Sequence, residues 1–139
     1  MRAIEITPGA IQTALNAISP DTPVMMINLL RYRDKADYGS RTDQTPCSGR
    51  DAYYQRYAEI ALKCVVKAGG SVFWLGNVFA NVVAPDGERW DDALLVQYPS
   101  FTCFPKVYDN PDYQAIAFHR TAALEDSRLI GTTTATGIG

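Results

Sequence analysis

The sequence predicts an α+β domain of ferredoxin-like βαββαβ order, with a four-stranded antiparallel sheet and an extra N-terminal helix. Four apolar runs of strand length and two amphipathic helical patterns follow one another in this order. Each run is also apolar on both alternating sets of positions, which is typical of strands covered on both faces. Because the chain has 139 residues and no internal repeat or linker, we expect one domain over residues 1–139.

The first part of the chain is expected to form a helix, a strand and a long loop. Residues 8–18 carry apolar side chains at helical spacing, and Ser19-Pro20 ends the pattern. The continuous apolar run from Val24 to Leu30 predicts the first strand. Residues 34–48 are polar, contain Gly and Pro and have no period, so they predict a loop that is long enough to close over a site.

The middle of the chain predicts a long helix and a hairpin. The helix begins after Ser48, whose hydroxyl can cap it, and ends at Gly69-Gly70. Its apolar stripe, expected to pack on the sheet, consists of Tyr53, Tyr57, Ile60, Ala61, Cys64 and Ala68. Residues 71–83 and 93–98 are strand-like, and the turn sequence at 84–87 should join them as an antiparallel hairpin.

The last part of the chain predicts two helical segments and a fourth strand. Ser100 can cap a short first turn, and a second helix should begin at Asn110-Pro111 and run through Leu124, with a break at Pro105 or Asn110. Residues 128–134 are β-branched and predict the fourth strand. We expect residues 135–139 to be frayed.

Composition excludes several classes of partner. The formal net charge is −2 with both signs interspersed, so neither nucleic acid nor an anionic membrane is an expected partner. The N-terminal residues lack the apolar core of a signal peptide, and no apolar run approaches the ~18 residues of a membrane span, so we expect a cytoplasmic protein. Cys47, Cys64 and Cys103 are widely spaced beside a single histidine, which predicts reduced thiols and no metal site. No nucleotide motif or haem cue occurs, and no cofactor is expected.

Four segments resemble the DUF1330 family and together span most of the chain. They are NLLRYR (28–33), SGRDAYYQRYAE (48–59), WDDALLVQYPS (90–100) and NPDYQAIAFHRTAALEDSRLI (110–130). The resemblance implies a dimeric α+β barrel, in which two ferredoxin-like units join through their open sheet faces and each half holds a cavity. The wider superfamily that it is similar to includes cofactor-free monooxygenases, muconolactone isomerases, haem-dependent chlorite dismutases and small stress proteins, so the fold does not choose a chemistry.

The apolar strands lead to the same expectation of a homodimer. Both helices of a ferredoxin-like unit cover one face of the sheet, and the other face here is also apolar. A second copy of the chain is the simplest cover for that open face.

Three strand residues are candidates for a ligand pocket. Asn28 interrupts an apolar strand, so its amide either ties down neighbouring backbone or faces a cavity where it can orient a ligand. Strand alternation groups Trp74 with Val72, and Gln97 with Leu95. If these sets face the barrel, Asn28, Trp74 and Gln97 line one mainly apolar pocket. The alternative is that Trp74 is core and Gln97 is a dimer contact.

His119 and two arginines complete the candidate set. His119 is the one histidine, but it falls off the packed stripe of its helix, so a solvated or subunit-edge position is favoured over a catalytic base. Arg31 and Arg33 follow the first strand and could bind a carboxylate at the mouth of the pocket. The alternative is a solvated charge cluster in which they pair with Asp34 and Asp37.

The sequence leaves two functions open. One is small-molecule binding, extending to a cofactor-independent enzyme, monooxygenase- or isomerase-like, that acts on a small carbonyl compound in the barrel cavity. The other is a non-catalytic structural or stress-related homodimer. The adjacent acidic residues Asp91 and Asp92 do not predict an acid/base pair, because neighbours on a strand point apart, so a turn or cap role is expected for them.

Overall fold

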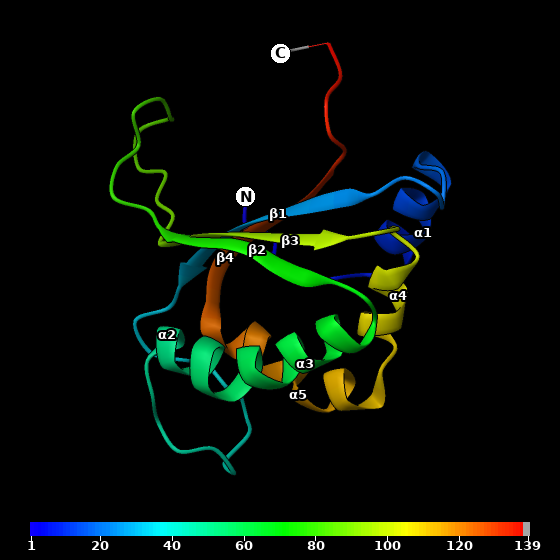
Figure 1. Ribbon diagram of the computed structural model, residues 1–139. Coiled ribbons are helices and arrows are strands. Elements are labelled where there is room, and N and C mark those ends of the chain that lie inside the picture. Colours follow the sequence, from blue (N-terminus) through cyan, green and yellow to red (C-terminus); the bar gives the residue numbers. More distant parts are fainter. Residues whose placement is uncertain (138–139) are drawn as a thin grey trace.

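The computed structural model describes residues 1–137, which form a sheet of strands packed against helices (Figure 1). In chain order the elements are α1 (Pro8–Ala17), β1 (Val24–Tyr32), α2 (Gly49–Asp51), the π-helical η1 (Ala52–Ala58), α3 (Glu59–Lys67), β2 (Ser71–Asn77), β3 (Asp92–Tyr98), α4 (Cys103–Tyr108), α5 (Pro111–Ala123) and β4 (Leu124–Thr132). The elements α2, η1 and α3 follow one another without a break and form the long helix that the sequence predicts.

The four strands form one antiparallel sheet in the order β2-β3-β1-β4. This order, with the first and third strands at the centre, is the ferredoxin-like arrangement, and the predicted fold class is confirmed. Asn28, in the middle of β1, lies opposite Leu94 of β3 and Leu129 of β4. The sheet therefore places Asn28 at its centre.

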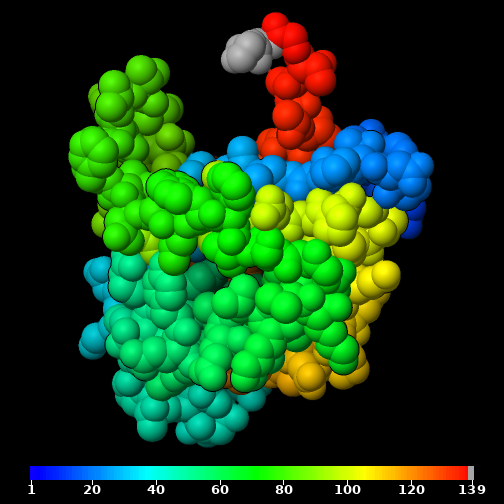
Figure 2. All heavy atoms as spheres, viewed as in Figure 1, coloured from blue at the N-terminus to red at the C-terminus, as the bar shows by residue number. Residues whose placement is uncertain are grey.

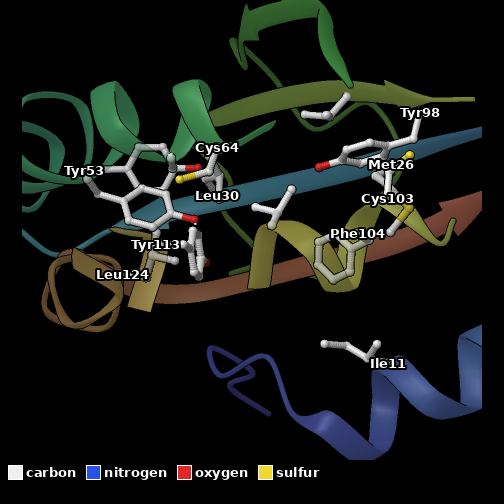
Figure 3. Close-up of a cluster of buried hydrophobic side chains, with 14 of the residues drawn as sticks. Ile11, Met26, Leu30, Tyr53, Cys64, Tyr98, Cys103, Phe104, Tyr113 and Leu124 are labelled. Atoms are coloured by element: carbon white, nitrogen blue, oxygen red, sulfur yellow. Dashed lines mark hydrogen bonds between the residues drawn. The ribbon is translucent and has the colours of Figure 1, made fainter. Parts of the chain in front are cut away.

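The long helix, α4 and α5 all lie on one side of the sheet (Figure 1). Alternate residues of β1 from Val24 to Tyr32 face these helices and are buried, whereas the residues between them are only half-buried. Figure 3 shows part of this core, where Tyr53 and Tyr113 from the helices approach Leu30 of the sheet. Ile11 of α1 lies apart from that group, across a space from Phe104.

The opposite face of the sheet, which we call the open face, carries no helix (Figure 1). By register its residues include Met25, Ile27, Leu29, Trp74, Ala93, Leu95, Gln97 and Ile130. Trp74 is 52% exposed and Ile130 is 50% exposed. Since most of these side chains are apolar, the open face is a hydrophobic surface.

A bulge in β2 changes the predicted face of one residue. The register shifts between Val72 and Trp74, so Val72 pairs with Val96 on the helix side and Trp74 pairs with Leu95 on the open face. A bulge adds one residue, here Phe73, and reverses the alternation beyond it. The prediction that Val72 and Trp74 share a face is therefore wrong.

Beyond β2 the chain leaves the sheet as a long arm, residues 78–91, which rises on the side of the open face (Figure 1). The predicted strand over 71–83 is thus too long, because the last ladder-like bond of the arm joins the amide of Val78 to the carbonyl of Asp91. The predicted turn at 84–87 is present within the arm, with Gly87 at φ 83° and a bond from Glu88 N to Pro85 O.

The C-terminal elements agree with the prediction in type but differ in their ends. Helix α4 contains Pro105, and the break before α5 falls at Asp109–Asn110. Helix α5 ends at Ala123, one residue earlier than predicted, because Leu124 already pairs with Tyr32 in the sheet. Strand β4 accordingly begins earlier than expected and ends at Thr132; residues 135–137 are in no helix or strand, and residues 138–139 lie outside the described part.

The predicted Ser48 cap is confirmed, since the Ser48 hydroxyl accepts the amide of Asp51 at 3.0 Å. The helix expected to begin at Asn110-Pro111 does begin there, and the Asn110 side chain accepts the amide of Asp112 at 2.8 Å. Within residues 1–137 no helix has the length and hydrophobicity needed to cross a bilayer.

Candidate functional site

A cavity of about 330 Å³ lies between the helix-facing side of the sheet and the helices η1, α3, α4 and α5. Its walls are mostly aliphatic and aromatic, with Met26, Leu94, Val96 and Leu129 from the strands and Ala58 and Val107 from the helices. We call it the central cavity. It is an apolar space built into the core between the two layers.

The central cavity opens at the free edge of β2. Val72 and Leu75 face the helix side and pair with β3, yet they are 40% and 45% exposed. Leu62 of α3 faces them across the opening and is also exposed. Figure 2 views this side of the molecule, where the surface is hollowed between β2 and the long helix.

Asn28 lies in the wall of the central cavity. Its amide nitrogen donates to the carbonyl of Leu94 at 3.3 Å, so it ties down one strand carbonyl. No hydrogen bond to its side-chain oxygen occurs among the described residues. The side-chain oxygen of Asn28 can therefore still accept a hydrogen bond from a ligand and orient it.

Two tyrosines bring their hydroxyl groups together in the same wall. The hydroxyls of Tyr57 and Tyr113 are 2.8 Å apart, and both residues are buried. Burial raises the pKa of Tyr57 well above its ordinary value, and it raises the pKa of Tyr113 as well. Both phenols are therefore neutral at physiological pH. One hydroxyl donates to the other, so the pair has one proton left to donate to a ligand.

Among the described residues, Arg120 of α5 is the one that brings a charge to the wall. The residue is only 6% exposed, and its guanidinium donates to the backbone carbonyl of Ile4. It forms no ion pair within residues 1–137. A buried guanidinium that faces a cavity without a carboxylate is unusual, because buried charges are normally paired.

A second polar cluster surrounds Asp92, which is fully buried at the start of β3. Its carboxylate accepts from the Tyr32 hydroxyl at 2.7 Å, from Arg50 at 3.1 Å, from Asn77 at 2.8 Å and from the Tyr54 hydroxyl. Burial acts to raise the pKa of Asp92, but these hydrogen bonds and the charge of Arg50 outweigh it, and the pKa lies below its ordinary value.

The turn or cap role expected for Asp92 is therefore wrong, since the side chain points into the protein and the long helix supplies two of its donors. Three of the four donors bond to Oδ2 and one to Oδ1, and Asp92 itself does not line the central cavity. Tyr54 links the cluster to the central cavity, whose wall it joins. The Asp92 cluster thus positions one wall of the cavity.

His119 lies under the loop between β1 and α2 and is 8% exposed. Its Nδ1 is 2.7 Å from the Tyr38 hydroxyl, which also accepts a bond from Arg56 at 3.2 Å. Because Arg56 donates to that hydroxyl, the hydroxyl proton is free to point at Nδ1 of a neutral imidazole.

Burial lowers the pKa of His119, and the charges of Arg56 and Arg41 lower it further, against a smaller opposing effect of Asp43. The predicted solvated position is wrong because the loop covers that side of α5, where the amide of Asp37 donates to the carbonyl of Ala122. His119 does not line the central cavity.

The structure does not bring the remaining candidates together with Asn28. Trp74 and Gln97 lie on the open face, on the other side of the sheet from Asn28, and the Gln97 amide donates to Ser71 at 3.1 Å. Arg31, at the end of β1, does not line the central cavity, and its Nε is buried without a partner. Arg33 pairs with Glu125 at 3.1 Å, so its expected pairing with Asp34 or Asp37 is wrong.

The chain matches one known protein family over more than half of its length. A family model described as a domain of unknown function, DUF1330, matches residues 48–132. The chain belongs to the DUF1330 family. The match runs from the Ser48 cap to the end of β4, so it includes Tyr57, Tyr113 and Arg120 but not Asn28.

Solved structures support the fold of this DUF1330 chain over nearly its whole length. Two crystal structures of the RPA0582 protein, a protein of unknown function from Rhodopseudomonas palustris, are both 30% identical to it. The methylated form has a TM-score of 0.84 and the match covers 97% of this chain and 96% of that chain. The second structure has a TM-score of 0.83 with coverage of 99% and 100%.

A hydroxynitrile lyase from Passiflora edulis is similar at 12% identity, with a TM-score of 0.55 and coverage of 86% of this chain and all of that chain. At this identity the likeness concerns the fold alone. No curated protein matches the chain.

Proposed function

We propose that this DUF1330 chain binds a small, mainly apolar molecule in the central cavity. The observation that carries the proposal is an open cavity of about 330 Å³ whose mainly apolar walls also hold a few polar groups. Small-molecule sites usually take this form, at volumes of roughly 300–1,000 Å³. The polar groups are Asn28, the Tyr57–Tyr113 pair and Arg120.

The chemistry of these groups suits a ligand with an oxygen acceptor, such as a carbonyl compound. The phenols are neutral donors and Arg120 is a permanent cation, so together they would orient and polarise an oxygen atom. The one histidine lies outside the cavity wall. The proposal is therefore binding and carbonyl polarisation rather than proton abstraction by a histidine.

A titration with hydrocinnamamide, a neutral aromatic amide, tests this proposal. We expect binding to the wild type by isothermal titration calorimetry and an affinity loss of at least about tenfold in Ala58→Phe, whose new ring would fill the cavity. The matched control is Ala115→Phe on α5, where the alanine is exposed outside the cavity, and it should bind like the wild type.

A second variant separates ligand recognition from folding. Asn28→Leu replaces the amide with an apolar side chain of similar size, so we expect weaker binding from a folded protein. Equal affinity in the wild type, Ala58→Phe and Asn28→Leu would show that the probe binds elsewhere and would contradict the proposal.

A second candidate function, a homodimer, rests on the open face. Trp74 and Ile130 are half-exposed on that apolar sheet face. The arm that rises beside it carries Phe79, Val82 and Val83, each about nine-tenths exposed. Apolar surfaces of this extent usually mark an interface, and a second copy offers the same apolar surface in return. We propose that two chains pack through their open faces and arms.

A further inference from the structure

We infer that the ligand of the central cavity is a carboxylate, held by Arg120 beside the Tyr57–Tyr113 hydroxyls. The inference rests on the proposed function and names the chemical class of its ligand: a compact aromatic or aliphatic monocarboxylic acid. Its apolar body would occupy the space between sheet and helices, and its carboxylate would lie at the Arg120 end.

The first support is the electrostatic state of Arg120. A guanidinium has five N–H donors, and here one backbone carbonyl, that of Ile4, is the acceptor that the described residues provide. Burial of a cation is costly unless an anion or several acceptors compensate it. The C-terminal turn of α5, where Arg120 lies, contributes only a partial negative charge. Glu5 lines the neighbouring cavity together with Arg120, but its carboxylate accepts a hydrogen bond from Thr121 and forms no ion pair with Arg120. Among the described residues the guanidinium therefore has no paired negative charge.

The second support is where the guanidinium lies. Arg120 is in the wall of the central cavity and also in that of a neighbouring cavity of about 530 Å³ beneath α1 and the N-terminal segment. Ile6, Met26 and Phe104 line both spaces, so Arg120 lies where the two cavities adjoin. Its unused donors are not enclosed by protein atoms, because its nitrogens are not among the buried polar atoms without a partner.

The third support is the neighbouring donors, which assign the carboxylate to the central cavity. Tyr57 and Tyr113 line that cavity but not the neighbouring one. Burial raises the pKa of both phenols, and the positive charge of Arg120 acts against this rise, so the guanidinium is within electrostatic reach of both hydroxyls. The guanidinium and the neutral phenol pair offer hydrogen-bond donors and a positive charge but no negative charge. A carboxylate ligand would supply that negative charge and accept the hydrogen bonds.

Hydrocinnamate and hydrocinnamamide test the inference, because they differ only in the charge of the head group. Near neutral pH we expect the wild type to bind the acid at least about tenfold more tightly than the amide. In Arg120→Gln this preference should disappear through weaker binding of the acid, while the affinity for the amide changes by less than about threefold. Arg41→Gln, which removes an exposed arginine paired with Asp43, is the matched charge control and should keep the preference.

The outcomes separate this inference from the proposed function. If the wild type binds acid and amide equally, the carboxylate is not recognised and the inference is overturned, while the proposed function stands. If neither compound binds, both are overturned. If Arg120→Gln loses affinity for both compounds in equal proportion, Arg120 supports the fold rather than the ligand; the wild-type comparison decides the matter even if that variant does not fold.

Discussion

Asp92 is the most completely enclosed charge of the described chain, and four side chains donate to its carboxylate. A buried carboxylate of this kind stabilises a fold only while all of its donors are kept. Two of the donors, Arg50 and Tyr54, belong to the long helix, and Asn77 belongs to β2. Asp92, which belongs to β3, thereby joins the long helix to β2 and β3 beside the opening of the central cavity.

Replacing Asp92 by Asn should lower the free energy of unfolding by about 3 kcal/mol near neutral pH, because it leaves buried donors without their charged acceptor. Urea denaturation measures this, with the exposed Asp86→Asn in the arm as the control. Since the pKa of Asp92 lies below its ordinary value, its contribution is present above that value and is lost as the pH falls through the folded-state pKa. The difference in unfolding free energy between the wild type and Asp92→Asn should therefore become smaller in acid. If Asp92→Asn were as stable as the wild type at neutral pH, this role of Asp92 would be contradicted.

His119 gives a second pH-dependent contribution. Its pKa in the folded protein is lowered from 6.5 by burial and by Arg56 and Arg41, so folding favours the neutral ring. The stability that this gives is present above the ordinary pKa and is lost as the pH falls through the lower folded-state value. We expect acidification from neutral pH to destabilise the wild type more than His119→Gln in urea titrations. Parallel pH profiles for the two proteins would refute this role of the ring.

Sequence reasoning identified some of these residues and missed others for a physical reason. Alternation along β1 grouped Asn28 correctly with Met26 and Leu30, because that strand is regular, but this face of the sheet lies toward the helices and not on the side of Trp74 and Gln97. It failed for Trp74 because a bulge cannot be seen in the order of apolar residues. It gave Asp92 a turn or cap role and did not single out Arg120, because charged residues are normally solvated and only the packed structure shows that these two are enclosed.

At the scale of elements, the start of the long helix is held in a tight junction. Gly49 N donates to the carbonyl of Arg33 at 3.0 Å, and a Cβ on Gly49 would collide with the carbonyl oxygens of Arg33 and Ala123. These atoms are backbone and cannot rotate aside. The junction therefore joins the long helix to the ends of β1 and α5 at one point.

Gly49→Ala should lower the free energy of unfolding by about 2–3 kcal/mol, as overpacking of a close contact does. Gly9→Ala is the matched control, since Gly9 lies in α1 with no atom near its Cβ position. Alanine favours a helix over glycine, so the control should be stabilised by up to about 1 kcal/mol. Thermal and urea unfolding measure the stability of both variants relative to the wild type. If Gly49→Ala changed the free energy of unfolding by the same amount as Gly9→Ala, the junction would not be tight.

The elements themselves were largely predictable, and the differences have local causes. Apolar runs identified all four strands of the sheet, and Ser48 and Asn110 marked two helix starts. The strand predicted over 71–83 was too long because Val82 and Val83 have strand-forming side chains but no neighbouring strand to bond. Leucine favours a helix by propensity, and the pairing of Leu124 with Tyr32 in the sheet overrides this preference.

At the scale of the whole molecule, the sheet separates two apolar features. The central cavity lies on the helix side and the open face lies on the other, so ligand binding and self-association use different surfaces of one sheet. The sequence alone could not distinguish them, since every strand is apolar on both sides. Trp74 and Gln97, expected beside Asn28, belong instead to the proposed interface.

The wild type should therefore migrate as a dimer, at twice the chain mass of 15.3 kDa, in size-exclusion chromatography with light scattering. Trp74→Glu buries a charge in the proposed interface and should give the monomer mass. Val66→Glu is the control, because Val66 is also more than half exposed but lies on α3, and this variant should remain a dimer. A monomeric wild type, or a dimeric Trp74→Glu, would contradict the proposed interface.

The central claim, that the cavity between sheet and helices holds the ligand, is tested most directly by methyl NMR during a titration with hydrocinnamamide. Leu94 and Val96 line the cavity, whereas Leu95, between them in sequence, and Ile130 face the opposite side of the sheet. We expect chemical-shift changes at the methyl groups of Leu94 and Val96 and little change at Leu95 and Ile130. Changes confined to Leu95 and Ile130, or no changes at saturating probe, would contradict the account.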